Sequence, residues 1–332
     1  MILLALAGCG AGGSSICGED LQEREEFADF ISRAEAQFVI PGLDEGLTPQ
    51  GIGRSKETGL IYISAYAGDN APSVISAVSP ETGERAAEYR LFNGDGTPFT
   101  GHVGGVAVTE DQLYLSAEMD SSIRNSVAVL PLAELPVSGS HDVVVDKTIP
   151  VPVSPSFLSC SQGFLWVGNF YHPAAGYGLP AEIPYTTASA DGEYGGYILG
   201  YRLDSGGLTV PEGAACPVPD VALAAPGRLQ GMVCLPDGVM LSQSYGRRNN
   251  SALLVYDLAL DEPPDISLDI GGHMISAYVL DSLRLRESLT AMPMTEGLCL
   301  SPEGVLVLFE SGSSRYSGGS YRTDRVWAVQ VE

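Results

Sequence analysis

Residues 229–257 read LQGMVCLPDGVMLSQSYGRRNNSALLVYD, three short apolar runs separated by a Pro-Asp-Gly turn and by a longer polar loop. Short apolar runs that are bounded by turn residues are typical of antiparallel strands. A unit of three strands cannot bury its apolar faces alone, so the fold depends on how often the unit recurs.

The unit occurs five times in the chain. The first runs begin at Pro49-Gln50-Gly51-Ile52, Gly101-His102-Val103-Gly104, Pro155-Ser156-Phe157-Leu158, Leu229-Gln230-Gly231-Met232 and Thr295-Glu296-Gly297-Leu298. After a turn come the second runs LIYISAY, QLYLSAE, FLWVGNF, VMLSQSY and VLVLFES, and a third run follows each of them. Repeated meanders at this spacing are typical of the blades of a β-propeller, which surround a central channel.

The two ends of the chain decide the number of blades. The last unit stops at Val331-Glu332 after its third strand, so its blade lacks a fourth. The strand-like segment Ala36–Leu43 precedes the first unit and can supply that strand. We therefore predict an all-β propeller of five four-stranded blades over residues 36–332. A sixth blade within 257–294 is the alternative, and the insertions 171–195 and 261–292 are expected to be long loops.

The N-terminal part of the sequence contains a predicted targeting signal and a predicted helix. Leu6-Ala7-Gly8-Cys9 resembles the lipobox of bacterial lipoproteins, which implies a lipidated Cys9 and a signal remnant and tether over 1–18. No basic residue precedes the short apolar run, as would follow from a start codon assigned too late. The resemblance implies an extracytoplasmic bacterial protein, held at the membrane through Cys9 alone. Residues 19–35 have an acidic start and helical apolar spacing, which predicts one short amphipathic helix.

The composition limits the partners. The chain of 332 residues has 41 acidic and 17 basic side chains, for a net charge of −24. This charge argues against nucleic acid and against anionic lipid headgroups, both of which require basic surfaces. Apolar residues make up 45% of the chain and charged residues 17%, which excludes wholesale disorder. Cys160, Cys234 and Cys299 lie in first runs and are expected to be buried thiols without disulfides.

The repeat alignment predicts one polar mouth of the channel. In a propeller the start of each first strand lies at the same face as the end of the second strand, and polar side chains gather at these positions. A concave site with convergent polar groups is the default ligand site. The predicted ligand-binding residues are Gln50, Tyr66, His102, Glu118, Ser156, Asn169, Tyr171, Gln230, Gln243, Tyr245, Arg247, Glu296, Glu310 and Arg315.

Glu296 is the sharpest candidate, because it is an acid inside an apolar stretch. Its burial is costly unless it is hydrogen-bonded, paired with Arg247 or Arg315, or bound to a cation. A Ca²⁺ or Mg²⁺ ion in the channel would take oxygen ligands. The predicted oxygen donors are Glu296, Asn169, Glu118 and Glu310. His102, which is followed by Val103 and two glycines, is a candidate general base.

With the repeats in view, the chain resembles exported bacterial propellers of the YncE, NHL-repeat and gluconolactonase-like (SMP-30) kind. The likeness rests on Ser-Pro-Glu-Thr-Gly-Glu at 79–84 and on strands of the LYLS and LLVYDL type. Gluconolactonase-like enzymes hold a divalent metal with Glu, Asn and Asp, which implies metal roles for Glu296 and Asn169. The chain departs from that pattern, since no channel Asp completes the set.

Two functions follow as hypotheses. The first is a surface-anchored lipoprotein that binds a small molecule, a glycan or a partner protein at the polar mouth. The alternative is a metal-assisted, lactonase-like hydrolase or lyase acting on a lactone or sugar-like substrate in the same channel, with Glu296 as ligand and His102 as base. In either case we expect a monomer that contacts the membrane only through its lipid.

Overall fold

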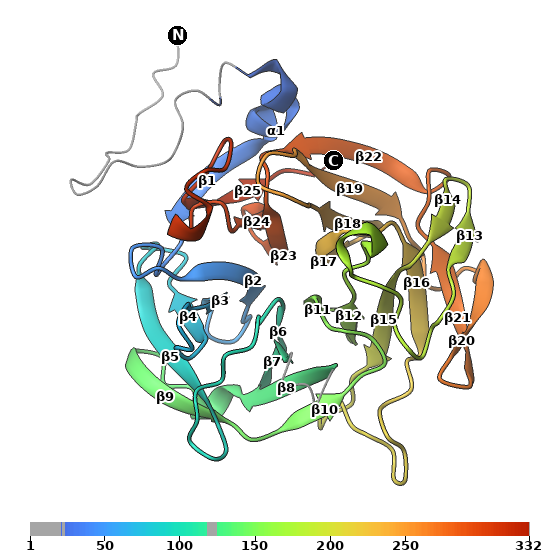
Figure 1. Ribbon diagram of the computed structural model, residues 1–332, viewed down its shortest axis with the longest axis horizontal. Helices are drawn as coiled ribbons and strands as arrows, with labels where there is room; N and C mark the ends of the chain where they lie inside the picture. The colour runs from blue at the N-terminus through green and yellow to red at the C-terminus, as the bar shows by residue number, and fades with distance from the viewer. Residues whose placement is uncertain (1–20, 22–23, 118–124, 332) are drawn as a thin grey trace.

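The computed structural model describes residues 21, 24–117 and 125–331, and these form a ring of five β-sheets (Figure 1). Cys9 and Glu118 lie outside the described residues. The innermost strands of the five sheets are β2 (Thr48–Arg54), β6 (Val106–Val108), β11 (Phe157–Ser161), β17 (Leu229–Leu235) and β23 (Thr295–Ser301). The predicted all-β five-bladed propeller is therefore confirmed.

The outermost strand of blade 1 comes from the part of the sequence that forms blade 2. Blade 1 has the order β2-β3-β4-β5-β9, with β3 (Ile61–Tyr66), β4 (Val74–Val78), β5 (Arg85–Asn93) and β9 (Gly139–Val145). Blade 2 has the order β6-β7-β8-β10, with β7 (Gln112–Ala117), β8 (Ser126–Pro131) and β10 (Thr148–Pro150). Strand β9 lies in the sequence between β8 and β10, yet it pairs in parallel with β5. The 3₁₀ turn η3 (Leu132–Glu134) leads into it. Blade 2 thus covers the outer edge of blade 1 with part of its own chain.

Blades 3 and 4 are joined in the same way. Blade 3 continues outward from β11 through β12 (Phe164–Gly168), β15 (Gly196–Arg202), β16 (Val221–Ala225), β21 (His273–Val279) and β20 (Ile266–Ile270). Blade 4 continues from β17 through β18 (Gly238–Gln243), β19 (Ser251–Asp257) and β22 (Leu285–Ala291). The hairpin β20–β21 follows β19 in the sequence but pairs in parallel with β16.

The two insertions therefore differ from the predicted loops. Segment 261–292 forms β20, β21 and β22 because its apolar residues, such as Leu268 and Ile275, are buried against blade 3. For the same reason 257–294 is not a sixth blade. Segment 171–195 contains the 3₁₀ turn η4 (Pro173–Ala175) and the hairpin of β13 (Thr187–Ser189) and β14 (Gly192–Tyr194).

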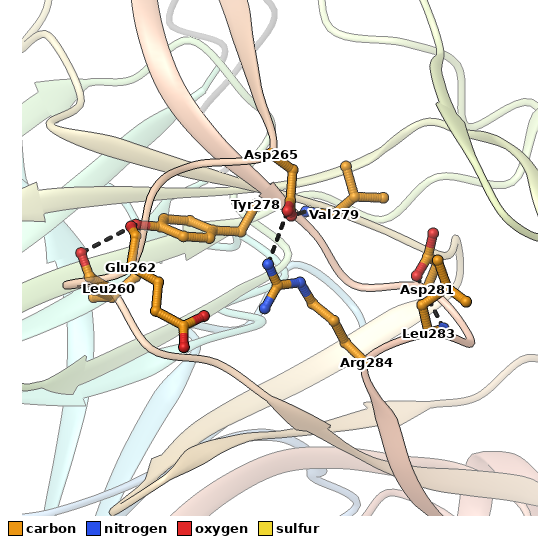
Figure 2. Close-up of polar contacts among 8 residues, drawn as sticks. All are labelled: Leu260, Glu262, Asp265, Tyr278, Val279, Asp281, Leu283 and Arg284. Carbon is orange, nitrogen blue, oxygen red and sulfur yellow. Dashed lines mark hydrogen bonds and ion pairs between the residues drawn. The ribbon is translucent and has the colours of Figure 1, made fainter.

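Polar contacts fasten the added hairpin (Figure 2). The Arg284 guanidinium forms an ion pair with Asp265 at 2.8 Å, and the other Asp265 oxygen accepts from the Val279 backbone N–H. Asp281 accepts from the backbone N–H of Ala190 at 2.8 Å, in the turn between β13 and β14. These contacts tie the two insertions to each other beside blade 3.

Blade 5 joins the two ends of the described chain. β1 (Ala34–Val39) pairs antiparallel with β25 (Arg325–Val329), which is followed inward by β24 (Gly304–Phe309) and β23. This is the predicted closure, although β1 begins two residues before the predicted segment. The described helical part consists of η2 (Glu25–Phe27) and α1 (Ala28–Arg33). It ends at Arg33 and not at residue 35, because residues from Ala34 onward pair with β25. The turn η5 (Ser314–Tyr316) lies between β24 and β25.

Free thiols lie between the blades near the other end of the channel. Cys160, Cys234 and Cys299 carry no disulfide, and burial raises the pKa of Cys234 to about 11 and of Cys299 to about 12. Among the described residues, none of the helices has the length and apolar character needed to cross a bilayer.

Candidate functional site

Three innermost strands carry a β-bulge at the same place in the repeat. The register shifts between Pro49 and Gly51 in β2, between Leu229 and Gly231 in β17, and between Thr295 and Leu298 in β23. The bulged positions contain Gln50, Gln230 and Glu296, which is how the repeat alignment placed them. A bulge turns a side chain away from the regular pleat, and bulges are common beside functional sites.

A glycine follows each of these three polar residues, and it lets neighbouring blades meet. A Cβ on Gly51 would lie 2.7 Å from the backbone nitrogen of Val106 in the next blade. A Cβ on Gly231 would lie 2.7 Å from the Glu296 carbonyl oxygen. Neighbouring innermost strands therefore approach each other closely beside the polar residue, because only glycine fits there.

Two carboxyl groups meet at this narrow point. Glu296 is 2% exposed and Glu310, which follows β24, is partly buried. The Gln230 side-chain amide donates to Glu296 Oε1 at 3.1 Å, and the Gln50 amide donates to Glu310 Oε2 at 2.9 Å. The carboxyls are also hydrogen-bonded to each other, and the Tyr316 hydroxyl is bonded to Glu310. We call Glu296 and Glu310 the carboxyl pair.

The surroundings of the carboxyl pair raise the pKa of both groups. Burial raises the pKa of Glu296 well above its ordinary value, and the negative charge of Glu310 raises it further. Burial also raises the pKa of Glu310, while hydrogen bonds from Tyr316 and Gln50 and the charge of Arg315 act in the opposite direction. Two buried carboxyls in contact do not both ionise readily, so burial and their mutual repulsion favour a proton on the pair.

Tyrosines and arginines surround the pair. The hydroxyls of Tyr66 and Tyr316 lie 3.2 Å apart. The Arg247 guanidinium lies 4.9 Å from the centre of the Tyr316 ring, and that of Arg315 lies 5.3 Å from the Tyr66 ring. The His102 ring stacks on Tyr66 at 4.4 Å. Burial and the charge of Glu310 raise the pKa of Tyr316, so its hydroxyl stays protonated.

These groups line a cavity of about 360 Å³ at the mouth of the channel. Ligand pockets have volumes of roughly 300–1,000 Å³, so a small molecule fits. Phe170, Tyr177 and Tyr245 form an aromatic side of the cavity, with Phe170 and Tyr177 in edge contact at 4.9 Å. All five blades contribute residues to the lining.

Strained backbone and an unpaired hydroxyl also lie at this mouth. Val103, Arg228 and Met294 have φ angles of 44°, 65° and 70°, each just before an innermost strand. Such outliers persist where the surrounding structure holds them, often at functional sites. The Ser116 hydroxyl lines the cavity, is buried and has no hydrogen-bond partner among the described residues. An orphaned buried hydroxyl is a natural contact for a ligand or a water.

The cavity brings most of the predicted residues together. Its lining includes Gln50, Tyr66, His102, Ser156, Gln230, Tyr245, Arg247, Glu310 and Arg315. Glu296 lies directly behind Gln230. Ligand binding by these residues stays a prediction.

Three predicted residues lie outside the lining of this cavity and make contacts within the fold. Asn169 accepts from the Tyr197 backbone N–H at 2.6 Å and donates to the Gly195 carbonyl. The Gln243 amide donates to the Gly227 carbonyl at 2.8 Å, and the Tyr171 ring packs against Gly195.

Several lining residues were absent from the predicted set, among them Ser116, Phe170, Tyr177 and Tyr316. Tyr316 adjoins Arg315 in the sequence, and that adjacency was the available signal. Phe170 and Tyr177 lie on the insertion after β12, where no repeat assigns a direction to a side chain.

Three of the four predicted metal ligands, Glu296, Asn169 and Glu310, lie in the described part of the chain, and all three are engaged in hydrogen bonds within the protein. The Asn169 amide is hydrogen-bonded to the backbone of blade 3. The carboxyl oxygens of Glu296 and Glu310 accept hydrogen bonds from Gln50, Gln230 and Tyr316. A cation site needs several converging oxygen acceptors. Within the described ranges, no three His, Cys, Asp or Glu side chains gather as metal ligands.

A second cavity, of about 640 Å³, opens at the opposite end of the channel. It is lined by the ends of the innermost strands, including Arg54 and the three thiols Cys160, Cys234 and Cys299.

Solved structures similar to this chain match it at low identity. They include a GH43_1 enzyme from Xanthomonas citri complexed with xylose (11% identity, 92% of this chain and 93% of that chain, TM-score 0.46). A putative oxidoreductase (glucose dehydrogenase) from Thermus thermophilus is 13% identical over 89% of this chain and 98% of that one, with a TM-score of 0.40. Hydrazine synthase from Kuenenia stuttgartiensis is 14% identical over 78% of this chain, with a TM-score of 0.35, and the match spans 55% of that chain. No protein-family model and no curated protein matches the sequence.

Proposed function

We propose that this protein is a surface-anchored β-propeller whose channel mouth binds a small polyhydroxylated molecule of the glycan class. The observation that carries the proposal is the carboxyl pair, which lies at the base of a cavity with two glutamine amides hydrogen-bonded to it. Sugar hydroxyls donate and accept hydrogen bonds, and this lining offers partners for both.

Two further features support a ligand at this place. The buried hydroxyl of Ser116 has no hydrogen-bond partner among the described residues, so a hydroxyl of the ligand would form that hydrogen bond. Tyr245 is 41% exposed at the aromatic side, where an apolar ring face can cover the C–H face of a sugar.

The alternative, a metal-assisted hydrolase or lyase acting on a lactone or sugar-like substrate, has less support. Its ligand set would require Glu296 and Asn169 to bind one cation, whereas both the oxygen and the nitrogen of the Asn169 amide are hydrogen-bonded within blade 3. Two-carboxylate glycosidases keep their carboxyl groups about 5–9.5 Å apart so that the sugar lies between them. The carboxyl pair is directly hydrogen-bonded, which favours recognition over that chemistry.

The anchoring part of the proposal rests on Cys9. Lipidation there would place the propeller on the outer side of a bacterial membrane, behind a short flexible tether. Cys9→Ser should move the protein from the membrane fraction to the soluble extract, while Cys17→Ser should leave it in the membrane. Equal membrane association of both variants would refute the anchor.

Binding is tested with the soluble domain from about residue 19 against an array of oligosaccharides, followed by calorimetry on the hits. Gln50→Ala and Gln230→Ala should weaken binding by about tenfold each, since each removes hydrogen-bonding capacity at the base of the cavity. Gln37→Ala, on the outer strand β1, is the matched control. Unchanged binding by both cavity variants, or no hit on the array, would contradict the proposed site.

A further inference from the structure

The mouth of the channel contains two arginine side chains that form no ion pair with any acidic residue in the described part of the chain. None of the ion pairs among the described residues includes Arg247 or Arg315. Both are exposed, and both line the cavity. In a chain of net charge −24 with 41 acidic side chains, two such arginines at one cavity are a distinctive feature.

Aromatic rings hold both guanidinium groups in place. Arg247 lies over Tyr316 and Arg315 lies over Tyr66, and the two tyrosines are joined through their hydroxyls. The Tyr66 ring is in turn stacked on His102. Stacking orients a guanidinium without using its N–H groups, so the donors of both arginines stay available for a ligand. Because the groups are held before binding, little side-chain entropy is lost when a ligand arrives.

Glu310 does not use up these donors. It takes hydrogen bonds from Gln50 and Tyr316, and the charge of Arg315 reaches it without an ion pair within 4 Å. Burial raises the pKa of both carboxyls, which limits the negative charge of the carboxyl pair. A ligand anion at the rim would therefore meet two cations.

We propose, on the basis of the proposed function, that the ligand is an acidic sugar whose carboxylate binds Arg247 and Arg315 while its hydroxyls contact the carboxyl pair and Ser116. A guanidinium presents parallel N–H donors that match the two oxygens of a carboxylate. The overall negative charge repels anions at long range, so selection of such a ligand depends on the contacts of its carboxylate with Arg247 and Arg315. Salt screens these charged contacts, so the affinity falls as the ionic strength rises.

Calorimetry with four probes tests the inference: tri-galacturonate, its neutral counterpart galactotriose, a sulfated galactose oligomer and tri-glucuronate. We expect a uronate to bind at least tenfold more tightly than galactotriose, with affinity falling between 20 mM and 500 mM salt. Arg247→Gln and Arg315→Gln should each weaken uronate binding about tenfold or more and leave galactotriose binding unchanged. Arg248→Gln, an exposed neighbour outside the cavity lining, is the matched control.

Each other outcome is decisive. Equal binding of neutral and acidic probes, with no effect of either arginine variant, overturns the inference and leaves the proposed function standing. Tight binding of the sulfated probe alone overturns the assignment of a carboxylate. Failure of all four probes, together with an empty oligosaccharide array, removes the proposed function and the inference at once. Circular dichroism of each variant confirms that these surface substitutions leave the fold intact.

Discussion

Glu296→Gln is the substitution that reports most directly on the carboxyl pair. The amide has the shape of a protonated carboxyl, so it can still donate to Glu310 and accept from Gln230. It removes only the option of ionising. If Glu296 holds its proton in the folded protein, the variant should be as stable as the wild type in acid and more stable than the wild type at neutral pH.

The magnitude follows from proton linkage. The unfolded chain releases the Glu296 proton near its ordinary pKa of 4.5, whereas the folded protein retains it well above that value. Between these two pKa values the folded state binds one more proton than the unfolded state, so the stability of the wild type falls as pH rises. The free energy of unfolding of Glu296→Gln should therefore exceed that of the wild type by about 1.4 kcal/mol more for each pH unit above 4.5, until the folded pKa is reached.

Urea unfolding at pH 4, 5, 6 and 7 measures this difference, provided that the m-values of both proteins agree. Glu303→Gln, in the exposed turn between β23 and β24, should show no such pH-dependent gain. A difference that stays flat from pH 4 to 7 would show that Glu296 does not hold the proton. A wild type that gains on the variant as pH rises would mean an ionised Glu296 paired with a cation, and would restore the metal hypothesis.

Three further predictions concern the scaffold. Gly51→Ala places a Cβ 2.7 Å from the Val106 backbone nitrogen and should cost about 1–3 kcal/mol in thermal or urea melts, whereas Gly68→Ala, with open space around its Cβ, should cost far less. At pH 8 the thiols of Cys234 and Cys299 should resist a disulfide reagent until urea is added, because their pKa values are raised to about 11 and 12; rapid reaction of the folded domain would refute their burial. Neither EDTA nor Ca²⁺ should move the melting temperature, since the donor set does not suit a cation; a rise with Ca²⁺ would contradict this.

The repeat was sufficient to predict the blade number, the closing strand and the residues that start each innermost strand. Gln50, Gln230 and Glu296 could be placed at one mouth because periodicity carries a position in one blade over to the next. The sequence also placed Glu296 and Glu310 in one set of oxygen donors, but it could not predict that the two carboxyls contact each other, since this contact depends on the bulge in β23 and on a register that no sequence pattern states.

Edge pairing was the other part that the sequence could not supply. Strands β9 and β21 pair in parallel with strands of a different blade, and parallel partners far apart in the chain leave no local signal. Asn169 shows the matching limit for side chains. Its place in the repeat predicted that its side chain faces the channel, but its amide is hydrogen-bonded to the backbone at the end of the following insertion.

The closure of blade 5 has a consequence for the order in which the protein assembles. Ala34 pairs with Val329, so the first strand of the ring has no partner until nearly all of the chain has been made. The sheet of blade 1 is likewise incomplete until β9 has been made, and the sheet of blade 3 is incomplete until the hairpin β20–β21 has been made. Contacts between such distant segments slow folding, because a long loop must close before they form. The growing chain thus carries open sheet edges, and the ring is completed only after β25 has been made.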